Sequence, residues 1–320
     1  MAATSRVTTP FTARTTAAEI LDGVDLTGRR MIVTGGASGI GTETTRALAG
    51  AGAEVTVATR DPGRAAALVE EFAGSGPGSV RAAALDLADL ASVDAFVADW
   101  EGPLHALVGN AGIMAIPTRQ LTPVGWELQL ATNYLGHFAL ARGLHDNLRD
   151  AGAARVVLIG SGAHLREEFD FDDPQFERRP YNCWVAYGQS KTAEVLLAVG
   201  IAQRWAADGI TANALNPGYI ITELQRHMDE ESLRRFGALD EAGNRVTPSY
   251  YKTPAQGAAT TVLLAASPLV ETATGRYFDD NQEAEVVTDK EAPGGVAAHA
   301  LDPATADRLW TYAEQALTSR

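Results

Sequence analysis

The sequence has very little cysteine, because Cys183 is the only one in 320 residues. A single thiol cannot form a disulfide within the chain, so we expect a reducing, cytoplasmic compartment. The chain also lacks an uninterrupted apolar run of about 18 residues, the length that a membrane-spanning helix needs. No apolar segment of a secretion signal follows Met1. We therefore expect a protein without a membrane span.

Basic residues are also scarce, with 26 Lys and Arg against 40 Asp and Glu and a formal net charge of −14. This charge opposes binding to nucleic acid, which is not an expected partner. The six histidines do not have zinc-ligand spacing, and the acidic run at 170–173 lacks the glycine and glutamate of a calcium loop. No G-x-S-x-G elbow surrounds Ser161, which disfavours a serine hydrolase. Neither a metal site nor hydrolysis is therefore predicted.

Short apolar runs alternate with stretches of helical periodicity along most of the chain. Strands are predicted at 30–33, 55–58, 80–85, 104–108, 155–159, 210–215 and 275–278. Helices are predicted between them at 43–48, 65–72, 90–100, 122–148, 184–204 and 256–265. Strands joined in this way favour right-handed crossovers and a parallel sheet. The prediction is an α/β Rossmann fold, a single doubly wound parallel sheet of about seven strands with helices on both faces.

The domain boundaries follow from the same pattern. Residues 1–28 are predicted to be an N-terminal extension, and residues 29–290 the oxidoreductase domain, with a substrate loop at 219–252. Residues 291–320 are expected to form a surface tail that contains a helix. The long helices at 122–148 and 184–204 could pair two copies into a homodimer, unless the insert before Tyr187 blocks that contact.

A glycine-rich turn follows the first predicted strand at residues 34–41, with the sequence Thr-Gly-Gly-Ala-Ser-Gly-Ile-Gly. Glycines at such a turn let the backbone approach a pyrophosphate at a helix N-terminus, although a turn of this kind often has no ligand. Asp86 follows the third strand and could contact an adenine amino group or cap a helix. Asn110, Ala111 and Gly112 follow the fourth strand, at the sheet edge where such folds bind ligands.

Tyr187 and Lys191 are four residues apart in a predicted helix, so their side chains share one face. A lysine ammonium near a phenol favours the phenolate, which indicates acid-base chemistry. An isolated pair at this spacing, however, usually belongs to the ordinary surface of an amphipathic helix and has no catalytic role. Asn133 lies among core positions of another helix, where a buried amide needs partners, holds a water or locally opens the helix. Ser161 ends the fifth strand and would project its hydroxyl into the same crevice.

The order of these motifs resembles the short-chain dehydrogenase/reductase family from residue 33 to residue 278. The family's T-G-x-x-x-G-x-G motif corresponds to residues 34–41, N-A-G to 110–112, Y-x-x-x-K to 187–191 and P-G to 217–218. Gly109 departs from the family pattern, which often has a second asparagine there, and Leu158 and Gly160 replace commoner polar residues. Segments 15–26, 187–191 and 275–278 resemble the retinol-dehydrogenase-like and WW-domain-oxidoreductase-like branch, although no WW domain is present.

The resemblance implies a nicotinamide-dependent short-chain dehydrogenase that acts on carbonyl or alcohol groups. Tyr187 would be the general acid and base, and Lys191 would stabilise the phenolate and hold the nicotinamide ribose. Ser161 would bind the reacting oxygen, and Asn133 would anchor a water in the proton relay. The predicted cofactor-binding residues are Gly35, Ser38, Gly39, Ile40, Gly41, Thr59, Arg60, Asp86, Leu87, Asn110, Ala111, Gly112, Tyr187, Lys191, Pro217 and Gly218.

The end of the second strand predicts a preference for NADP(H) over NAD(H). An NAD-selective site usually has a carboxylate about 20 residues beyond the glycine turn, whereas Thr59 stands there and Arg60 follows. Arg60 can pair with a 2′-phosphate. A reading shifted by two residues would instead make Asp61 the ribose ligand, but Asp61-Pro62 is typical of a helix cap and first-turn proline.

Aromatic residues are frequent between Ser161 and Tyr187. We expect Met114, His164, Trp184 and Tyr219 to line a pocket for a small, partly apolar carbonyl or alcohol, although a loop packed on itself would use the same residues. An alternative function is a non-catalytic protein that senses the dinucleotide or binds a partner on the same fold.

Overall fold

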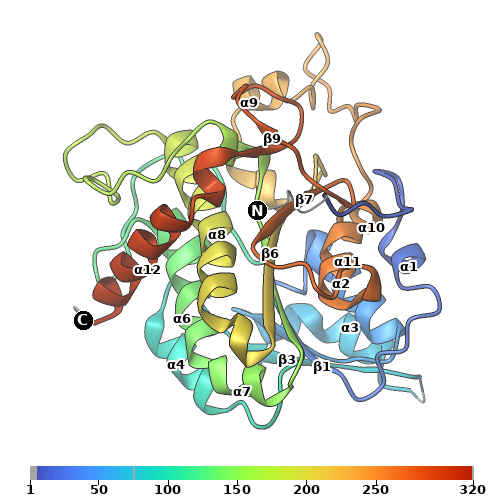
Figure 1. Cartoon of the computed structure of the whole chain (residues 1–320). Helices are drawn as coiled ribbons and strands as arrows, with labels where there is room; N and C mark the ends of the chain where they lie inside the picture. Colours follow the sequence, from blue (N-terminus) through green and yellow to red (C-terminus); the bar gives the residue numbers. More distant parts are fainter. Residues whose placement is uncertain (1–5, 75, 319–320) are drawn as a thin grey trace.

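The computed structural model describes residues 6–74 and 76–318 (Figure 1). Its eight-stranded sheet has the order β3-β2-β1-β4-β5-β6-β7-β8. The strands are β1 (Arg30–Thr34), β2 (Glu54–Thr59), β3 (Ser79–Ala84), β4 (Ala106–Gly109), β5 (Ala154–Ile159), β6 (Ile210–Asn216), β7 (Arg276–Asp279) and β8 (Gln282–Glu283). The first seven run parallel, and β8 pairs antiparallel with β7.

This sheet is the predicted Rossmann fold, with additions that the sequence did not predict. The seven predicted strands are all present, and β8 extends the sheet by one short strand. A separate parallel pair consists of β9 (Val286–Val287) and β10 (Val296–Ala297). The chain runs outward from β1 through β2 to β3, then crosses to β4 on the other side of β1 and continues outward from there, which opens a crevice at the carboxyl ends of the central strands.

Helices cover both faces of the sheet, because neighbouring strand residues point to opposite sides. Ile32 belongs to one hydrophobic core and Met31 and Val33 to the other. One face carries α1 (Ala17–Ile20), α2 (Gly39–Gly50), α3 (Ala66–Glu71), α10 (Pro254–Gly257) and α11 (Ala259–Ala266). The other face carries α4 (Leu90–Ala98), α5 (Leu128–Leu130), α6 (Gly136–Gly143), α7 (His145–Asp150), α8 (Cys183–Trp205) and α12 (Pro303–Thr318).

The predicted helix at 122–148 is wrong as a continuous element. Helical structure begins only at Leu128, because the Glu127 carboxylate caps it by accepting hydrogen bonds from the N–H groups of Gln129 and Leu130. A π-helical turn at Ala131–Leu135 then separates α5 from α6, and a break at Leu144 separates α6 from α7. The π turn contains Asn133, so the helix is locally widened at a predicted site residue.

The C-terminal helix α12 packs along α8 (Figure 1). Trp310 makes edge-on ring contacts with Trp205 and Phe138. Gly200 allows this approach, because a Cβ there would lie 3.1 Å from the Trp310 ring. The segment 291–320, expected to be a surface tail with a helix, therefore contributes part of the core through its described residues.

The N-terminal residues also reach the substrate-loop region. Arg14 donates hydrogen bonds to the carbonyl oxygens of Ser249 and Tyr251, at the end of the loop 219–252. Gln256 in turn donates to the Arg14 carbonyl oxygen at 2.9 Å. This segment was predicted as a loop, and in the structure it also holds a short helix, α9 (Glu230–Arg235).

Candidate active site

A cavity of about 1010 Å³ lies at the carboxyl ends of the central strands, where the crevice was expected. Most of the predicted site residues line it together. They are Gly35, Ser38, Gly39, Ile40, Thr59, Arg60, Asp86, Leu87, Asn110, Ala111, Gly112, Met114, Ser161, Trp184, Tyr187, Lys191, Pro217, Gly218 and Tyr219. Gly41, Asn133 and His164 do not line this cavity, and each has another place in the structure.

Gly41 shapes the turn from inside. A Cβ at Gly41 would lie 2.5 Å from the Asn110 side-chain nitrogen and still closer to the Gly35 carbonyl oxygen, so only glycine fits. Gly35 has φ +64°, in the left-handed region. Ser38, the residue before α2, makes no side-chain capping bond, which leaves the first N–H groups of α2 without that partner. The turn therefore has the geometry to receive a phosphate group.

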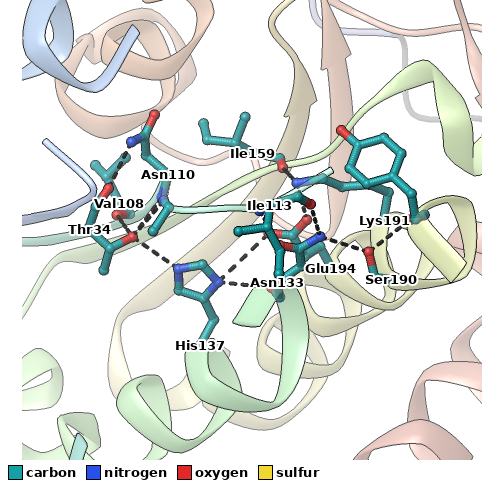
Figure 2. Close-up of polar contacts among 12 residues, drawn as sticks. Thr34, Val108, Asn110, Ile113, Asn133, His137, Ile159, Ser190, Lys191 and Glu194 are labelled. Carbon is teal, nitrogen blue, oxygen red and sulfur yellow. Dashed lines mark hydrogen bonds and ion pairs between the residues drawn. The ribbon is translucent and has the colours of Figure 1, made fainter. Parts of the chain in front are cut away.

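Thr34 fastens the glycine turn to the Asn110–Gly112 segment (Figure 2). Its hydroxyl oxygen accepts hydrogen bonds from the backbone N–H groups of Asn110 and Ala111, both at 2.9 Å. The Asn110 side chain donates to the Thr34 carbonyl oxygen at 2.8 Å. Backbone and side-chain hydrogen bonds thus hold together two predicted cofactor segments, the glycine turn after β1 and the segment at 110–112 after β4.

His137 connects Thr34 to the π turn, a link that the sequence analysis did not identify (Figure 2). Its Nδ1 lies 2.9 Å from the Asn133 carbonyl oxygen, and its Nε2 lies 3.0 Å from the Thr34 hydroxyl. A carbonyl can only accept, so Nδ1 carries the proton and Nε2 accepts from Thr34 in the neutral ring. Burial lowers the pKa of His137 to about 4, which keeps it neutral near pH 7.

Asn133 clamps two predicted site segments together (Figure 2). Its side-chain oxygen accepts from the Ile113 N–H at 2.9 Å, and its side-chain nitrogen donates to the Ile113 carbonyl oxygen at 3.0 Å. The same nitrogen donates to the Ser190 hydroxyl at 2.9 Å, and that hydroxyl donates to the Tyr187 carbonyl oxygen. The buried amide predicted to need partners therefore has them, and they fix the helix that carries Tyr187.

Tyr187 and Lys191 both face the cavity from the first half of α8. The Lys191 ammonium lies 5.7 Å from the centre of the Tyr187 ring. Burial raises the pKa of Tyr187, whereas the charge of Lys191 and a hydrogen bond with Ser161 lower it, and the net pKa stays above the ordinary value. From the sequence, only the lowering of this pKa by Lys191 was expected. Burial and a nearby carboxylate outweigh that effect in the structure.

That carboxylate belongs to Glu194, which the sequence analysis did not identify as a site residue. One of its oxygens lies 2.5 Å from the Lys191 ammonium, which also donates to the Ile159 carbonyl oxygen at 2.7 Å (Figure 2). Glu194 has no exposed surface. A carboxylate three residues after a lysine, surrounded by apolar helix residues, was the available signal.

The departures from the family pattern fit one another in space. Gly109 and Leu158 are register partners on adjacent strands. A Cβ at Gly109 would lie 2.7 Å from the Leu158 side chain and 3.3 Å from the His137 ring. At Gly160 a Cβ would lie 2.9 Å from the Leu215 carbonyl oxygen and 3.0 Å from the Tyr277 ring. The larger Leu158 thus occupies the space that a side chain at residue 109 would need.

The Arg60 end of the cavity contains residues predicted to select the cofactor. Thr59, Arg60 and Asp61 all line it. Asp61 accepts a hydrogen bond from the Gly63 N–H at 3.0 Å and caps the short helix at Pro62–Ala65. The prediction that Asp61-Pro62 starts a helix is therefore confirmed. Arg64, at the same end, forms an ion pair with Glu223 of the substrate loop at 2.7 Å.

Another part of the cavity lining is aromatic. The Trp184 ring centre lies 5.5 Å from that of Phe236 and 6.3 Å from that of Tyr187. Tyr219 lies 5.9 Å from Phe236, so the substrate loop and α8 meet through these rings. Phe236 was not predicted, because its position in the loop 219–252 showed no periodicity.

His164 does not line the cavity, where it was expected. Its ring is buried and centred 4.7 Å from the Tyr277 ring. Its Nδ1 lies 2.5 Å from the Ser161 carbonyl oxygen, and its Nε2 accepts from the Ala297 N–H. Burial lowers the pKa of His164 to about 4. The neutral His164 ring thus links the Ser161 carbonyl oxygen to Ala297 of β10.

Within residues 6–74 and 76–318, no helix has both the length and the apolar composition needed to cross a bilayer. The same residues contain no group of three or more His, Cys, Asp or Glu side chains placed to hold a metal ion.

The chain is similar to several known proteins. The family described as short chain dehydrogenase matches residues 29–233. A "Probable oxidoreductase" of Streptomyces lividans is 67% identical over 92% of this chain and 100% of its own length. Retinol dehydrogenase 14 of Homo sapiens is 34% identical over 90% of this chain and 85% of its own length. The solved Pseudomonas aeruginosa RhlG/NADP active-site complex has a TM-score of 0.60 and 26% identity, covering 81% of this chain and 97% of that chain.

Proposed function

The chain belongs to the short-chain dehydrogenase family, as an NAD(P)-dependent oxidoreductase, and from this premise we propose that it transfers a hydride between NADP(H) and the carbonyl or alcohol group of a partly apolar small molecule. The observation that carries the proposal is the single cavity lined by the glycine turn, by Tyr187 with Lys191, and by an aromatic wall. These three parts supply a phosphate site, an acid-base pair and an apolar surface.

The residues present fit a nicotinamide dinucleotide. The turn at 34–41 and the uncapped start of α2 suit a pyrophosphate, and Asp86 lines the cavity beyond the third strand. Arg60 would hold a 2′-phosphate with its guanidinium, and Lys191 would hold the nicotinamide ribose. The cofactor supplies the hydride chemistry when bound, and the protein supplies orientation and proton transfer.

Tyr187 would act as the general acid in reduction and the general base in oxidation. In reduction its phenol would donate a proton to the substrate oxygen, and in oxidation its phenolate would accept that proton. The Ser161 hydroxyl binds the same oxygen. The Lys191 ammonium stabilises the phenolate that remains after the proton has left. Asn133 keeps the tyrosine helix against the segment at 110–113 through its bonds to Ile113 and Ser190.

We expect an apolar substrate because the wall next to Tyr187 consists of Met114, Trp184, Tyr219 and Phe236. The retinol dehydrogenase relative bears the name of an apolar alcohol, which agrees with this wall. A panel of aldehydes and ketones, graded from short and polar to long or aromatic, would test the proposal by NADPH absorbance. Activity confined to the polar members would contradict the substrate class.

The cofactor preference rests on Arg60 and gives a separate prediction. The wild type should bind NADPH more tightly than NADH, and Arg60→Ala should weaken NADPH binding by about 10- to 100-fold, the worth of a charge-assisted hydrogen bond. NADH binding should change little. Quenching of tryptophan fluorescence measures both, with Arg142→Ala, an exposed arginine outside the cavity, as the matched control. Equal or tighter NADH binding by the wild type would show that Arg60 does not select the cofactor.

We also expect the loop 219–252 to close over bound ligands, because Tyr219 and Phe236 line the cavity and the loop's backbone is mostly outside regular structure. Hydrogen exchange should slow in residues 219–236 and 162–167 when cofactor and substrate are added. Residues 169–171 should not respond, because Phe169 and Phe171 pack against Tyr312 and Arg308 of α12. Unchanged exchange in 219–236 would make that loop a passive surface.

A further inference from the structure

Glu194 forms a buried ion pair with a residue of the proposed acid-base machinery. It lies on α8 one turn after Lys191, and its carboxylate has no exposed surface. One carboxylate oxygen lies 2.5 Å from the Lys191 ammonium, which the Ile159 carbonyl oxygen holds from the other side at 2.7 Å. The ammonium is therefore held at a fixed point at the end of β5 (Figure 2), 5.7 Å from the centre of the Tyr187 ring.

Within residues 6–74 and 76–318, the second oxygen of Glu194 has no hydrogen-bond partner, although it is buried. It lies 3.8 Å from Nδ1 of His137 on α6, and that nitrogen is already committed to the Asn133 carbonyl oxygen. A buried oxygen without a hydrogen bond costs free energy. An ion pair that served only to stabilise the fold would therefore be expected to satisfy this oxygen. Without a donor on this oxygen, the ionised form of Glu194 lacks a hydrogen bond that would stabilise it.

The titratable groups that face Glu194 come from three elements. Lys191 and Tyr187 lie on α8 itself, His137 on α6 and Tyr277 on β7. Burial lowers the pKa of His137 to about 4 and raises the pKa of Tyr277 well above its usual value, so both stay uncharged near neutral pH. Among these groups, the charge of Glu194 therefore acts on Lys191 and Tyr187.

The carboxylate and the ammonium have opposite effects on the phenol. A positive charge near Tyr187 favours the phenolate, and a negative charge disfavours it. Since Glu194 contacts the same ammonium that acts on Tyr187, it cancels part of the effect of Lys191. We propose, on the premise of the function above, that Glu194 is a positioning residue: its buried carboxylate holds the Lys191 ammonium and sets how readily Tyr187 releases its proton.

The protonation of Glu194 makes this control depend on pH. Burial raises the pKa of Glu194 to about 7, against the lowering effect of Lys191. Above about pH 7 the ionised carboxylate opposes phenolate formation. Below it the protonated carboxyl group leaves the Lys191 charge uncompensated.

The first test is the pH profile of alcohol oxidation in Glu194→Gln, which keeps the shape of the side chain and removes its charge. We expect the midpoint of the rise with pH to move down by about one unit relative to the wild type, a tenfold rate difference on that limb. KM should change little. Glu194→Asp keeps the charge but draws it back from the ammonium, so its midpoint should fall between the two. Coincident profiles of the three proteins would overturn the proposal.

A matched control is Glu127→Gln, because Glu127 is also fully buried and lies on a different element from Lys191. Its midpoint should equal that of the wild type. A shift of the same size in Glu127→Gln would mean that any loss of a buried carboxylate moves the profile, and would remove the case for Glu194.

The second test needs neither turnover nor cofactor. In protein with ¹³C-labelled tyrosine phenol carbons, the Tyr187 resonance is assigned by its absence in Tyr187→Phe and titrated by NMR. The midpoint of the Tyr187 titration should be lower in Glu194→Gln than in the wild type. In Glu194→Asp it should also be lower, but by a smaller amount. The aspartate variant keeps the test available if the glutamine variant does not fold. An unchanged midpoint would overturn the proposal even if the enzyme is active. If Tyr187 proves dispensable for turnover, the proposed function fails, whereas this titration still reports on Glu194.

Discussion

Replacement of Tyr187 by phenylalanine is expected to lower turnover by at least 10²-fold, because it removes the proton that the reaction must transfer. The ring stays, so the packing against Trp184 and the cavity wall should change little. Cofactor binding should therefore survive. NADPH absorbance on a substrate of the wild type measures the first quantity, and tryptophan fluorescence quenching measures the second.

The matched control is Tyr134→Phe, which removes a buried hydroxyl elsewhere in the molecule. The Tyr134 hydroxyl donates to the Leu309 carbonyl oxygen at 3.1 Å and does not line the cavity. This variant should lose roughly 1 kcal/mol of unfolding free energy and keep its turnover. Near-normal turnover of Tyr187→Phe would contradict the tetrad of Asn133, Ser161, Tyr187 and Lys191 and would favour a protein that binds the dinucleotide without catalysis.

Replacement of Lys191 by methionine should reduce both activity and stability. Turnover should fall by at least about 10²-fold, since the phenolate loses its stabilising charge. At pH 8 the free energy of unfolding should fall by about 3–5 kcal/mol, because the buried Glu194 loses its partner and must either stay charged without it or take up a proton. Denaturant unfolding measures this loss, and Lys290→Met, at an exposed lysine, is the control.

The stability loss of Lys191→Met should depend on pH in a direction opposite to that of most carboxyl groups. Burial already raises the pKa of Glu194 from its ordinary value of 4.5 to about 7, and loss of Lys191 removes an effect that lowers it. A raised folded-state pKa contributes stability below the unfolded-state value, and that contribution is lost as the pH rises. The variant should thus be nearer to the wild type at pH 5 than at pH 8. An equal loss at both pH values would show that Glu194 does not titrate in this range.

The sheet could be predicted from the sequence because each strand is a short apolar run next to a turn. Periodicity also placed α8 within one residue at each end. The predicted helix at 122–148 failed because the Glu127 cap and the π turn depend on side-chain bonds that periodicity does not record. The packing of α12 on α8 depends on Gly200 fitting Trp310, two residues far apart in the chain.

Among the site residues, those in motifs were predictable because glycines and the Tyr187–Lys191 spacing have a local physical meaning. Sequence reasoning missed His137 and Glu194, although both lie within four residues of a predicted residue. Their importance comes from contacts across elements, between His137 and Thr34 and between the Lys191–Glu194 pair and Ile159. The placement of His164 failed for the same reason, since its ring turns toward Ala297 and Tyr277 instead of the cavity.

The fit between Gly109 and Leu158 bears on how this lineage could have diverged. An asparagine restored at residue 109 alone would meet Leu158 and the His137 ring, and a small residue at 158 alone would leave a void between β4 and β5. Either single change passes through a poorly packed intermediate. The two positions are therefore expected to be inherited as a pair, so relatives that share Leu158 should also share Gly109. A reconstruction of ancestral sequences that treats residues 109 and 158 as independent would therefore misrepresent how the two changes arose.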